Sequence, residues 1–251
     1  MHGQDPFNIQ TRTKKCNKRL PNHSPQLTMF STATRYWTPS YVTAKSNRML
    51  GFIKRNCAGI ISKDALKRLY ISLVRSHLCH CSQVWAPQTP MLMTEVEKVQ
   101  RRATRFICKN NELSYKDRLI SLNLLPINYW LEYLDILFFF KCKLGHIDIC
   151  VDSYVSFCSG RSRRGATGLF LNNIKANTSL FRNSFFVRIS NVWNAIPDEL
   201  KSEVSVNVFK NKLKSFFFSR LHKVFEPDDA RTYKLICYKC RRTNKLTKCF
   251  C

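Results

Sequence analysis

Four side chains that can bind metal or take part in catalysis lie close together in SHLCHCSQVWAP, residues 76–87. They are His77, Cys79, His80 and Cys81. Histidine and cysteine are the usual ligands of zinc, and a thiol beside an imidazole is a common nucleophile–base pair. On a helix, positions 77, 80 and 81 share one face. That face is partly the apolar one and no second group of ligands has a matching spacing, so we favour a packing role.

A second set of cysteines lies in CYKCRRTNKLTKCFC, residues 237–251, and consists of Cys237, Cys240, Cys249 and Cys251. Four thiolates can surround Zn²⁺ tetrahedrally, and C-x2-C is a common half-site, although a closing C-x-C is a less usual partner. Such a metal would present Arg241 and Arg242, on the loop between the two pairs, to phosphates. The alternative is a reduced tail without metal. Zinc is therefore an optional ligand, and we expect no required cofactor.

The net charge of +26, from 42 Lys and Arg against 16 Asp and Glu, points to a polyanionic partner. Phosphate backbones are the commonest such partner, and this charge exceeds what solubility needs. Both ends of the chain are the most basic parts, since no acidic residue lies between Asp5 and Asp64 or after Asp229. The first residues carry no apolar signal segment, and the longest apolar run is too short and too charged to span a bilayer. We expect a location in the nucleus or cytoplasm, neither secreted nor in a membrane.

The acidic residues do not form a recognisable catalytic motif. The Asp228–Asp229 pair follows Pro227 and precedes no apolar strand, so it reads as a solvated turn. Asp198 and Glu199 directly follow a helix stop and read as the charged first turn of the next segment. No phosphate-binding loop, G-x-S-x-G or H-E-x-x-H is present. The chain is therefore not expected to be an enzyme.

Apolar residues recur at three- and four-residue steps from Ser62 onward, which predicts a mainly α fold. One helix, capped by Ser62 with Asp64 in its first turn, should run continuously to Trp85. A capping box at Thr94 and Glu97 should begin the next helix. The remaining predicted boundaries are a helix start at Ser114, a break at Pro126, a helix over 128–144 ended by Gly145, a stop at Pro197 and a start at Ser205.

Five segments follow from these patterns. They are an irregular basic arm over 1–44, a helical domain over 45–158, a basic Gly/Ser-rich linker over 159–168, a second helical block over 169–225, and a basic Cys-rich tail over 226–251.

Five sequence blocks in these segments resemble sequences of one protein family, and they occur in the same order along the chain. The blocks are KSNRMLGFIKRN (45–56), LKRLYISLVRSHLCHCSQVWAP (66–87), VEKVQRRATRFI (96–107), YKDRLISLNLLPINYWLEYLDILFFFKCKLG (115–145) and FFVRISNVWNAIPDELKSEVSVNVFKNKLKSFF (185–217). Over about residues 45–250 the chain resembles the region that follows the polymerase core in jockey-like, LINE-type (non-LTR) retrotransposon reverse transcriptases, which are RNA-directed DNA polymerases. Residues 79 and 80 are usually Glu and Tyr in that family, so the His/Cys group looks like sequence drift.

The resemblance implies a thumb- and connector-like helical bundle that holds RNA, an RNA–DNA duplex or DNA through the phosphate backbone. The cations expected to do so lie off the apolar stripes, in the linker and in the tail. They are Lys54, Arg55, Lys67, Arg68, Arg75, Lys98, Arg101, Arg102, Arg105, Arg163, Arg164, Arg241 and Arg242.

The resemblance leaves alternatives to a non-catalytic binding fragment. The family's catalytic Asp-Asp hairpin, which holds the metal ions, is missing from this chain. The chain would then be part of an active polymerase whose palm domain is supplied separately, or the product of a pseudogene with no selected function. Residues 1–44 do not match the palm that would precede this region, which suggests a truncated or frame-shifted element copy.

Overall fold

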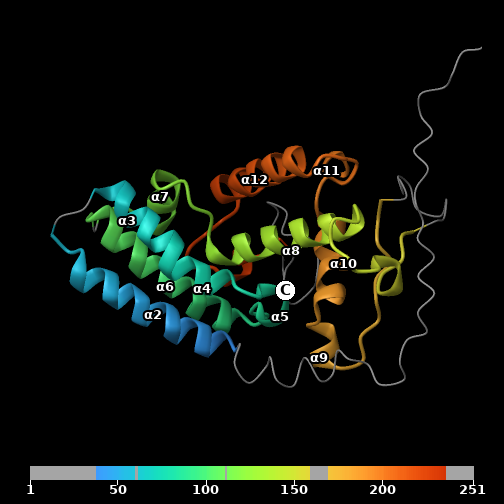
Figure 1. Cartoon of the computed structure of the whole chain (residues 1–251), viewed down its shortest axis with the longest axis horizontal. Coiled ribbons are helices and arrows are strands. Elements are labelled where there is room, and N and C mark those ends of the chain that lie inside the picture. Colours follow the sequence, from blue (N-terminus) through green and yellow to red (C-terminus); the bar gives the residue numbers. More distant parts are fainter. Residues whose placement is uncertain (1–37, 60–61, 111, 159–168, 236–251) are drawn as a thin grey trace, which may run out of the picture.

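The computed structural model describes residues 38–59, 62–110, 112–158 and 169–235 of the chain. These residues are mainly helical, which confirms the predicted fold class (Figure 1). Their β-structure is a single isolated bridge between Phe157 and Leu171. Within the same residues, no helix is both long and apolar enough to cross a bilayer.

The helices of the first half are, in chain order, α2 (Pro39–Asn56), α3 (Lys63–Leu69), the π-helical turn η1 (Tyr70–Arg75), α4 (Ser76–Cys79), α5 (Ser82–Trp85), α6 (Pro90–Cys108) and α7 (Tyr115–Ser121). Helix α2 packs against both α6 and η1, and α3 also contacts α6. These helices form a bundle on one side of the molecule (Figure 1). Val42, Leu50 and Ile53 are the buried apolar residues of α2 in this bundle.

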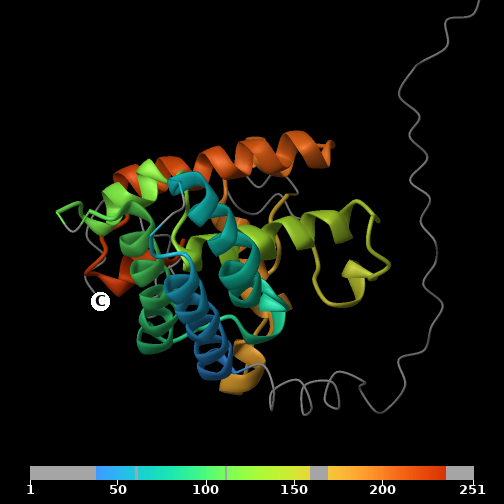
Figure 2. The same cartoon turned by 60° about the vertical axis from the view of Figure 1, so that its left-hand side comes forward.

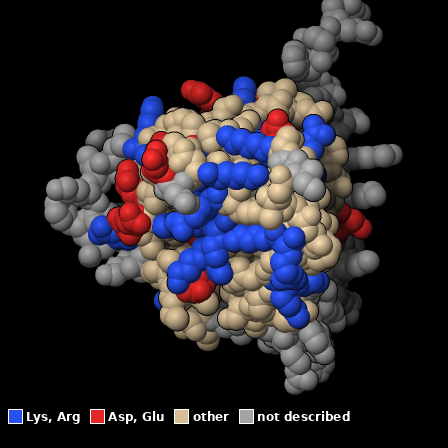
Figure 3. Space-filling model, turned by 90° about the vertical axis from the view of Figure 1, so that its left-hand side faces the viewer, with Lys and Arg blue, Asp and Glu red and all other residues tan. Residues whose placement is uncertain are grey.

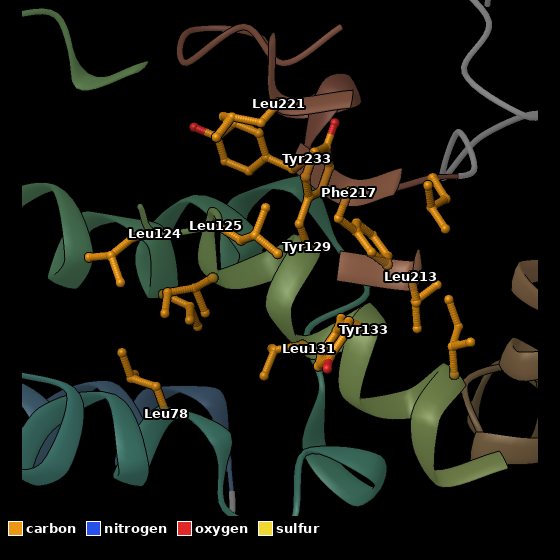
Figure 4. Packing of buried hydrophobic residues seen from close by; sticks show 14 of the residues in the cluster. Leu78, Leu124, Leu125, Tyr129, Leu131, Tyr133, Leu213, Phe217, Leu221 and Tyr233 are labelled. Atoms are coloured by element: carbon orange, nitrogen blue, oxygen red, sulfur yellow. The ribbon is translucent and has the colours of Figure 1, made fainter. Parts of the chain in front are cut away.

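Helix α8 (Ile127–Lys143) runs through the centre of the described structure (Figure 1). It packs against α5 and α6 and also against α10 and α12, so it is buried on several sides. Tyr129 and Tyr133 lie beside Phe217 of α12 (Figure 4), with the Tyr129 and Phe217 ring centroids 5.7 Å apart. The helix therefore joins the two halves of the chain.

The second half contributes η2 (Val151–Ser153), α9 (Ser179–Arg182), α10 (Phe185–Ala195), α11 (Asp198–Lys201), α12 (Val206–Lys223) and η3 (Ala230–Tyr233). Buried residues of α10 and α12 belong to the same hydrophobic core as those of α2, α6 and α8. One core thus runs across the predicted boundary at 159–168, residues that themselves lie outside the described part.

Residues 226–235, here named the C-terminal strap, fold back onto the bundle. Tyr233 and Leu235 are buried in the core, and the Tyr129 hydroxyl donates to the carbonyl oxygen of Thr232 at 2.7 Å. The first ten residues of the predicted tail are therefore part of the packed structure. Asp228, by contrast, is almost fully exposed in a turn, as predicted.

The predicted irregular arm ends earlier than expected, because residues 39–44 already belong to α2. The Thr38 hydroxyl oxygen accepts from the Tyr41 backbone N–H at 3.2 Å, and Pro39 occupies the first helical position. A Thr-Pro pair of this kind is a regular helix start. The remainder of the arm lies outside the described residues.

The prediction of one continuous helix from Ser62 to Trp85 is wrong at two points. The helix widens to a π-helical turn at Tyr70–Arg75, and it ends at Cys79 before a short new turn begins at Ser82. Cys81 adopts a left-handed backbone conformation with φ of 50°, which an α-helix does not contain. The Trp85 indole N–H donates to the His80 carbonyl oxygen at 2.7 Å and closes this corner.

The capping box at Thr94 is also wrong, since α6 begins earlier, at Pro90. Its cap is Thr89, whose hydroxyl oxygen accepts from the Leu92 backbone N–H, while the Thr94 hydroxyl bonds back to the Pro90 carbonyl. The other predicted boundaries are confirmed to within one residue at Ser62, Ser114, Gly145, Pro197 and Ser205, while α7 ends at Ser121, five residues before the predicted break at Pro126.

Candidate nucleic-acid interface

Four cations form one exposed stripe along α6. Lys98, Arg102 and Arg105 follow one another at steps of four and three residues, so they share one helix face, and Lys109 is the residue that caps the end of the helix. All four are exposed, whereas Val96, Val99, Ala103 and Ile107 are buried on the other side. The spacing that builds the core of α6 therefore also builds a basic outer surface.

The last turn of α2 extends this surface with Lys54 and Arg55. The Lys54 ammonium lies 5.9 Å from the ring centroid of Phe106 on α6, so the ends of the two helices are neighbours. The carbonyl groups at a helix C-terminus favour nearby cations. Helix α2 ends on the side of the molecule that Figure 3 turns toward the viewer, where Lys and Arg side chains form a broad band (Figures 1 and 3). We name Lys54, Arg55, Arg102, Arg105 and Lys109 the basic end.

Few ion pairs compensate the positive charge of the basic end. Within the part of the chain that the structure describes, the ion pairs on α6 are Lys98 with Glu95 and Arg101 with Asp228, and no carboxylate pairs with Arg55, Arg102 or Arg105. A group of exposed cations without carboxylate partners attracts phosphates.

Helix α3 contributes two of the predicted cations beside this surface. Arg68 is exposed, and Lys67 is half-buried where α3 faces α12. Both therefore remain candidates for phosphate contacts.

Arg75 is not on an outer face, which corrects the sequence-based prediction. Its side chain is buried, its Nη2 donates to the Leu125 carbonyl oxygen at 3.1 Å, and its guanidinium lies 4.6 Å from the Trp130 ring centroid. The π-helical turn explains the error, because a wider turn shifts the residues that follow it around the helix axis.

Arg101 is half-buried, and its guanidinium is engaged by contacts within the structure. Its Nη2 donates to the Tyr233 hydroxyl at 2.9 Å and to the Pro227 carbonyl, and its guanidinium stacks 4.9 Å from the Tyr115 ring centroid. These contacts fasten the C-terminal strap to α6. Arg101 therefore has a structural role here that its position next to Arg102 did not reveal.

Replacing Arg101 with Ala should loosen the strap while leaving nucleic-acid affinity nearly unchanged. Two hydrogen bonds and a stacking contact are lost, a cost of about 2 kcal/mol in unfolding free energy. Hydrogen exchange measured by mass spectrometry should become faster over 226–235. Arg102→Ala is the matched control: it should leave exchange in the strap unchanged and weaken binding instead. Equal exchange in the strap of both variants would contradict this assignment.

Among the residues that the structure describes, three carboxylates are buried, and each has a structural role. Glu97 accepts from the Tyr115 hydroxyl and from the backbone N–H groups of Ile127 and Asn128 at 3.1 and 3.3 Å. It thereby joins α6 to the start of α8 and to α7. Burial raises the pKa of the Glu97 carboxyl, against the opposing effect of these donors.

The other two, Glu132 and Asp135, lie one turn apart on α8. Asp135 pairs with Arg188 of α10 at 3.0 Å, and Glu132 accepts from the Leu235 backbone N–H at 2.8 Å. Burial raises the pKa of Glu132 to about 7, while burial lowers the pKa of its neighbour Lys234 to about 8. Glu132 thereby holds the end of the C-terminal strap against α8.

The raised pKa of Glu132 predicts a pH dependence of stability. The folded protein binds this proton more tightly than the unfolded chain, whose glutamate titrates near 4.5. The stabilisation is therefore complete below pH 4.5 and is lost as pH rises through 7. From pH 5 to 7.5 the wild type should lose on the order of 2 kcal/mol more than Glu132→Gln, an amide that retains an acceptor for Leu235. Urea unfolding at both pH values measures the difference, and parallel pH profiles would contradict it.

The His/Cys group does not come together as a metal site. Among the described residues, no group of three or more His, Cys, Asp and Glu side chains could hold a metal ion. Cys79 is close to Trp130, and burial raises the pKa of its thiol to about 11, whereas Cys81 is exposed at the corner after α4. A packing role therefore fits Cys79. It does not fit Cys81, because the helix ends at Cys79 and Cys81 is exposed.

Several predicted site residues lie outside the described residues. They are Arg163, Arg164, Arg241, Arg242, Cys237, Cys240, Cys249 and Cys251. Conversely, sequence reasoning omitted Lys109, which continues the α6 stripe, and Lys214 of α12, which faces Lys67. The step of four from Arg105 was the available signal for Lys109. The residue spacing within α12 does not indicate that Lys214 lies beside α3.

Comparison with known proteins adds no relative: no family model, no curated protein and no solved structure matches this chain.

Proposed function

We propose that the chain is a nucleic-acid-binding helical module derived from the reverse transcriptase of a LINE-type retrotransposon. It binds RNA or an RNA–DNA duplex through backbone phosphates and has no catalytic activity of its own. The observation that carries the proposal is the basic end, where Arg55, Arg102, Arg105 and Lys109 are exposed and Lys54 is half-buried on neighbouring helix ends.

The arrangement of these cations favours backbone contacts over base recognition. They project from the outside of a two-helix surface, and most are long, exposed side chains that can follow regularly spaced phosphates. Contacts of this type position a duplex without reading its sequence. Binding is therefore weakly sequence-specific and strongly dependent on salt.

The positions of the carboxylates favour a binding function over phosphoryl-transfer chemistry. Glu97 and Asp135 are engaged with donors in the interior, and Asp229 accepts from the backbone and side chain of Arg231. Polymerase chemistry needs carboxylates that converge on metal ions at an open site. The resemblance described above adds a separate reason, because the corresponding region in that family holds the template and duplex.

Salt-dependent binding tests the proposal. Fluorescence anisotropy with a labelled RNA hairpin and an RNA–DNA hybrid should give a slope of log K against log salt of about −4, as expected for four or five phosphate contacts. Shuffled sequences should bind within about threefold of one another. A slope near zero would contradict phosphate binding. Primer extension by the purified chain on an RNA template would contradict the non-catalytic part of the proposal.

A further inference from the structure

A groove separates α3 and η1 from α12. Trp130 and Leu134 of α8 and residues 123–125 line its floor, and its volume is about 480 Å³. Residues of α3 and α12, segments far apart in sequence, both line this groove, and the two helices meet near the top of Figure 2. This volume lies in the range of about 300–1,000 Å³ typical of pockets for small organic groups. It suits a nucleotide-sized group and is far too small for a duplex.

The lining of the groove is cationic. Lys67, Arg75 and Lys214 line it, and no carboxylate does so among the described residues. Lys67 comes from one wall and Lys214 from the other, while Arg75 lies at the inner side. The groove therefore favours an anionic occupant.

Arg75 supplies a second, independent sign of a ligand. Its side chain is more than nine-tenths buried, yet its Nε atom has no hydrogen-bond partner within the described structure. The Trp130 ring and the Leu125 carbonyl oxygen hold the guanidinium in place. Burying an unpaired donor of a charged group is costly. An anion in the groove would offset part of that cost by compensating the charge of the guanidinium.

Most of the remaining lining is apolar and partly aromatic, beside the polar residues Ser76 and Asn123. Ile71 is 41% exposed, and Phe218 of α12 lies beside Lys214, whose ammonium is 5.8 Å from its ring centroid. Proteins that bind single strands combine cations along the backbone with apolar and aromatic surfaces for the bases. A duplex keeps its bases stacked inside and cannot use such a groove. An unpaired strand can.

We infer that this groove binds an unpaired segment of nucleic acid, with a phosphate near Lys67, Arg75 and Lys214 and a base against Ile71 and Phe218. The inference rests on the proposed function and names a second substrate class, since the basic end holds duplex and the groove holds single strand.

Exposed groove residues allow a test that does not disturb folding. Anisotropy is measured with a 12-nucleotide single-stranded RNA and with an RNA hairpin whose stem has the same length. Lys214→Glu should weaken single-strand binding about 10-fold and hairpin binding less than twofold. Lys223→Glu, an exposed change of equal charge on another face of α12, should affect neither ligand more than twofold. Equal effects of the two substitutions on the single strand would overturn the inference.

An apolar pair makes a second test. Ile71→Asp should weaken single-strand binding, whereas Val208→Asp, at a position 42% exposed and outside the groove, should weaken it less. Equal losses would also overturn the inference. So would binding of an acidic peptide in the groove that the single strand does not displace.

These experiments distinguish a failure of the groove inference from a failure of the proposed function. If Arg102→Glu/Arg105→Glu leaves hairpin binding unchanged while Lys214→Glu reduces single-strand binding, the basic end fails and the groove stands. If the basic-end variant loses the hairpin and the groove variants lose nothing, the groove fails and the proposed function stands. If the wild type binds neither ligand at 100 mM salt, both fail.

Discussion

Replacing both Arg102 and Arg105 with glutamate is expected to lower the affinity for an RNA duplex by about 100-fold at 100 mM salt. Each substitution removes a phosphate contact and adds a repulsive charge, and a hundredfold loss corresponds to about 2.7 kcal/mol. The slope of log K against log salt should become shallower by about two units. Both side chains are exposed and lack an ion pair within the described structure, so folding should be unaffected.

The control for this variant is a protein of equal net charge. Lys175 and Lys223 are exposed and belong to neither α2 nor α6, so Lys175→Glu/Lys223→Glu should lower duplex affinity by less than fivefold. Anisotropy titrations at three salt concentrations compare the two variants. Equal losses in both would mean that net charge alone attracts the duplex, and the basic end would not be an interface.

The largest effect on stability is expected at Glu97, whose replacement with Ala should cost about 3–5 kcal/mol in unfolding free energy. The carboxylate accepts from the Tyr115 hydroxyl, from two backbone N–H groups at the start of α8 and from the Asn128 side-chain amide at 3.0 Å. Alanine leaves these donors buried without an acceptor and opens a cavity. One residue therefore joins three helices.

Glu95 is the matched control, two residues earlier on the same helix. Its carboxylate is partly exposed and pairs with Lys98 at 2.6 Å, so Glu95→Ala should cost less than about 0.5 kcal/mol. Urea unfolding at pH 7 followed by circular dichroism compares the two. A cost below 1 kcal/mol for Glu97→Ala would show that the buried network is not stabilising.

Local signals in the sequence located most helices. Ser62 and Ser114 cap helices as expected, and Gly145 adopts φ of 74° after α8. Residues 198–201 form a short helix, and the charged pair Asp198–Glu199, predicted as the first turn of a new segment, begins it. These features depend on side chains a few residues apart, so the pattern alone is informative.

Features that depend on contacts between distant segments were not predictable. The π-helical turn in η1 moved Arg75 from the expected outer face into the core, beside Trp130. In the sequence Arg101 cannot be distinguished from its exposed neighbour Arg102. Its contact with the C-terminal strap, more than a hundred residues further along the chain, is what buries it in part. A lysine or arginine is read as exposed from its type, yet its long stem and planar head can be buried when a distant partner is present.

The same reason limits the prediction of the candidate site. The α6 stripe follows from helical periodicity, so Lys98, Arg102 and Arg105 were found from sequence. The proximity of Lys54 to Phe106 and of Lys214 to Lys67 depends on how the helices pack. Periodicity identifies the face of a helix but not the element that lies beside it.

Lysine footprinting tests the central claim most directly. The wild-type chain is treated with an amine-reactive acetylating reagent with and without saturating RNA duplex, and modification is quantified by mass spectrometry. Lys54, Lys98 and Lys109 should become several-fold less reactive when duplex is bound, while Lys175 and Lys223 should keep their reactivity. Protection spread evenly over all of these lysines, or confined to those outside α2 and α6, would contradict binding at the basic end.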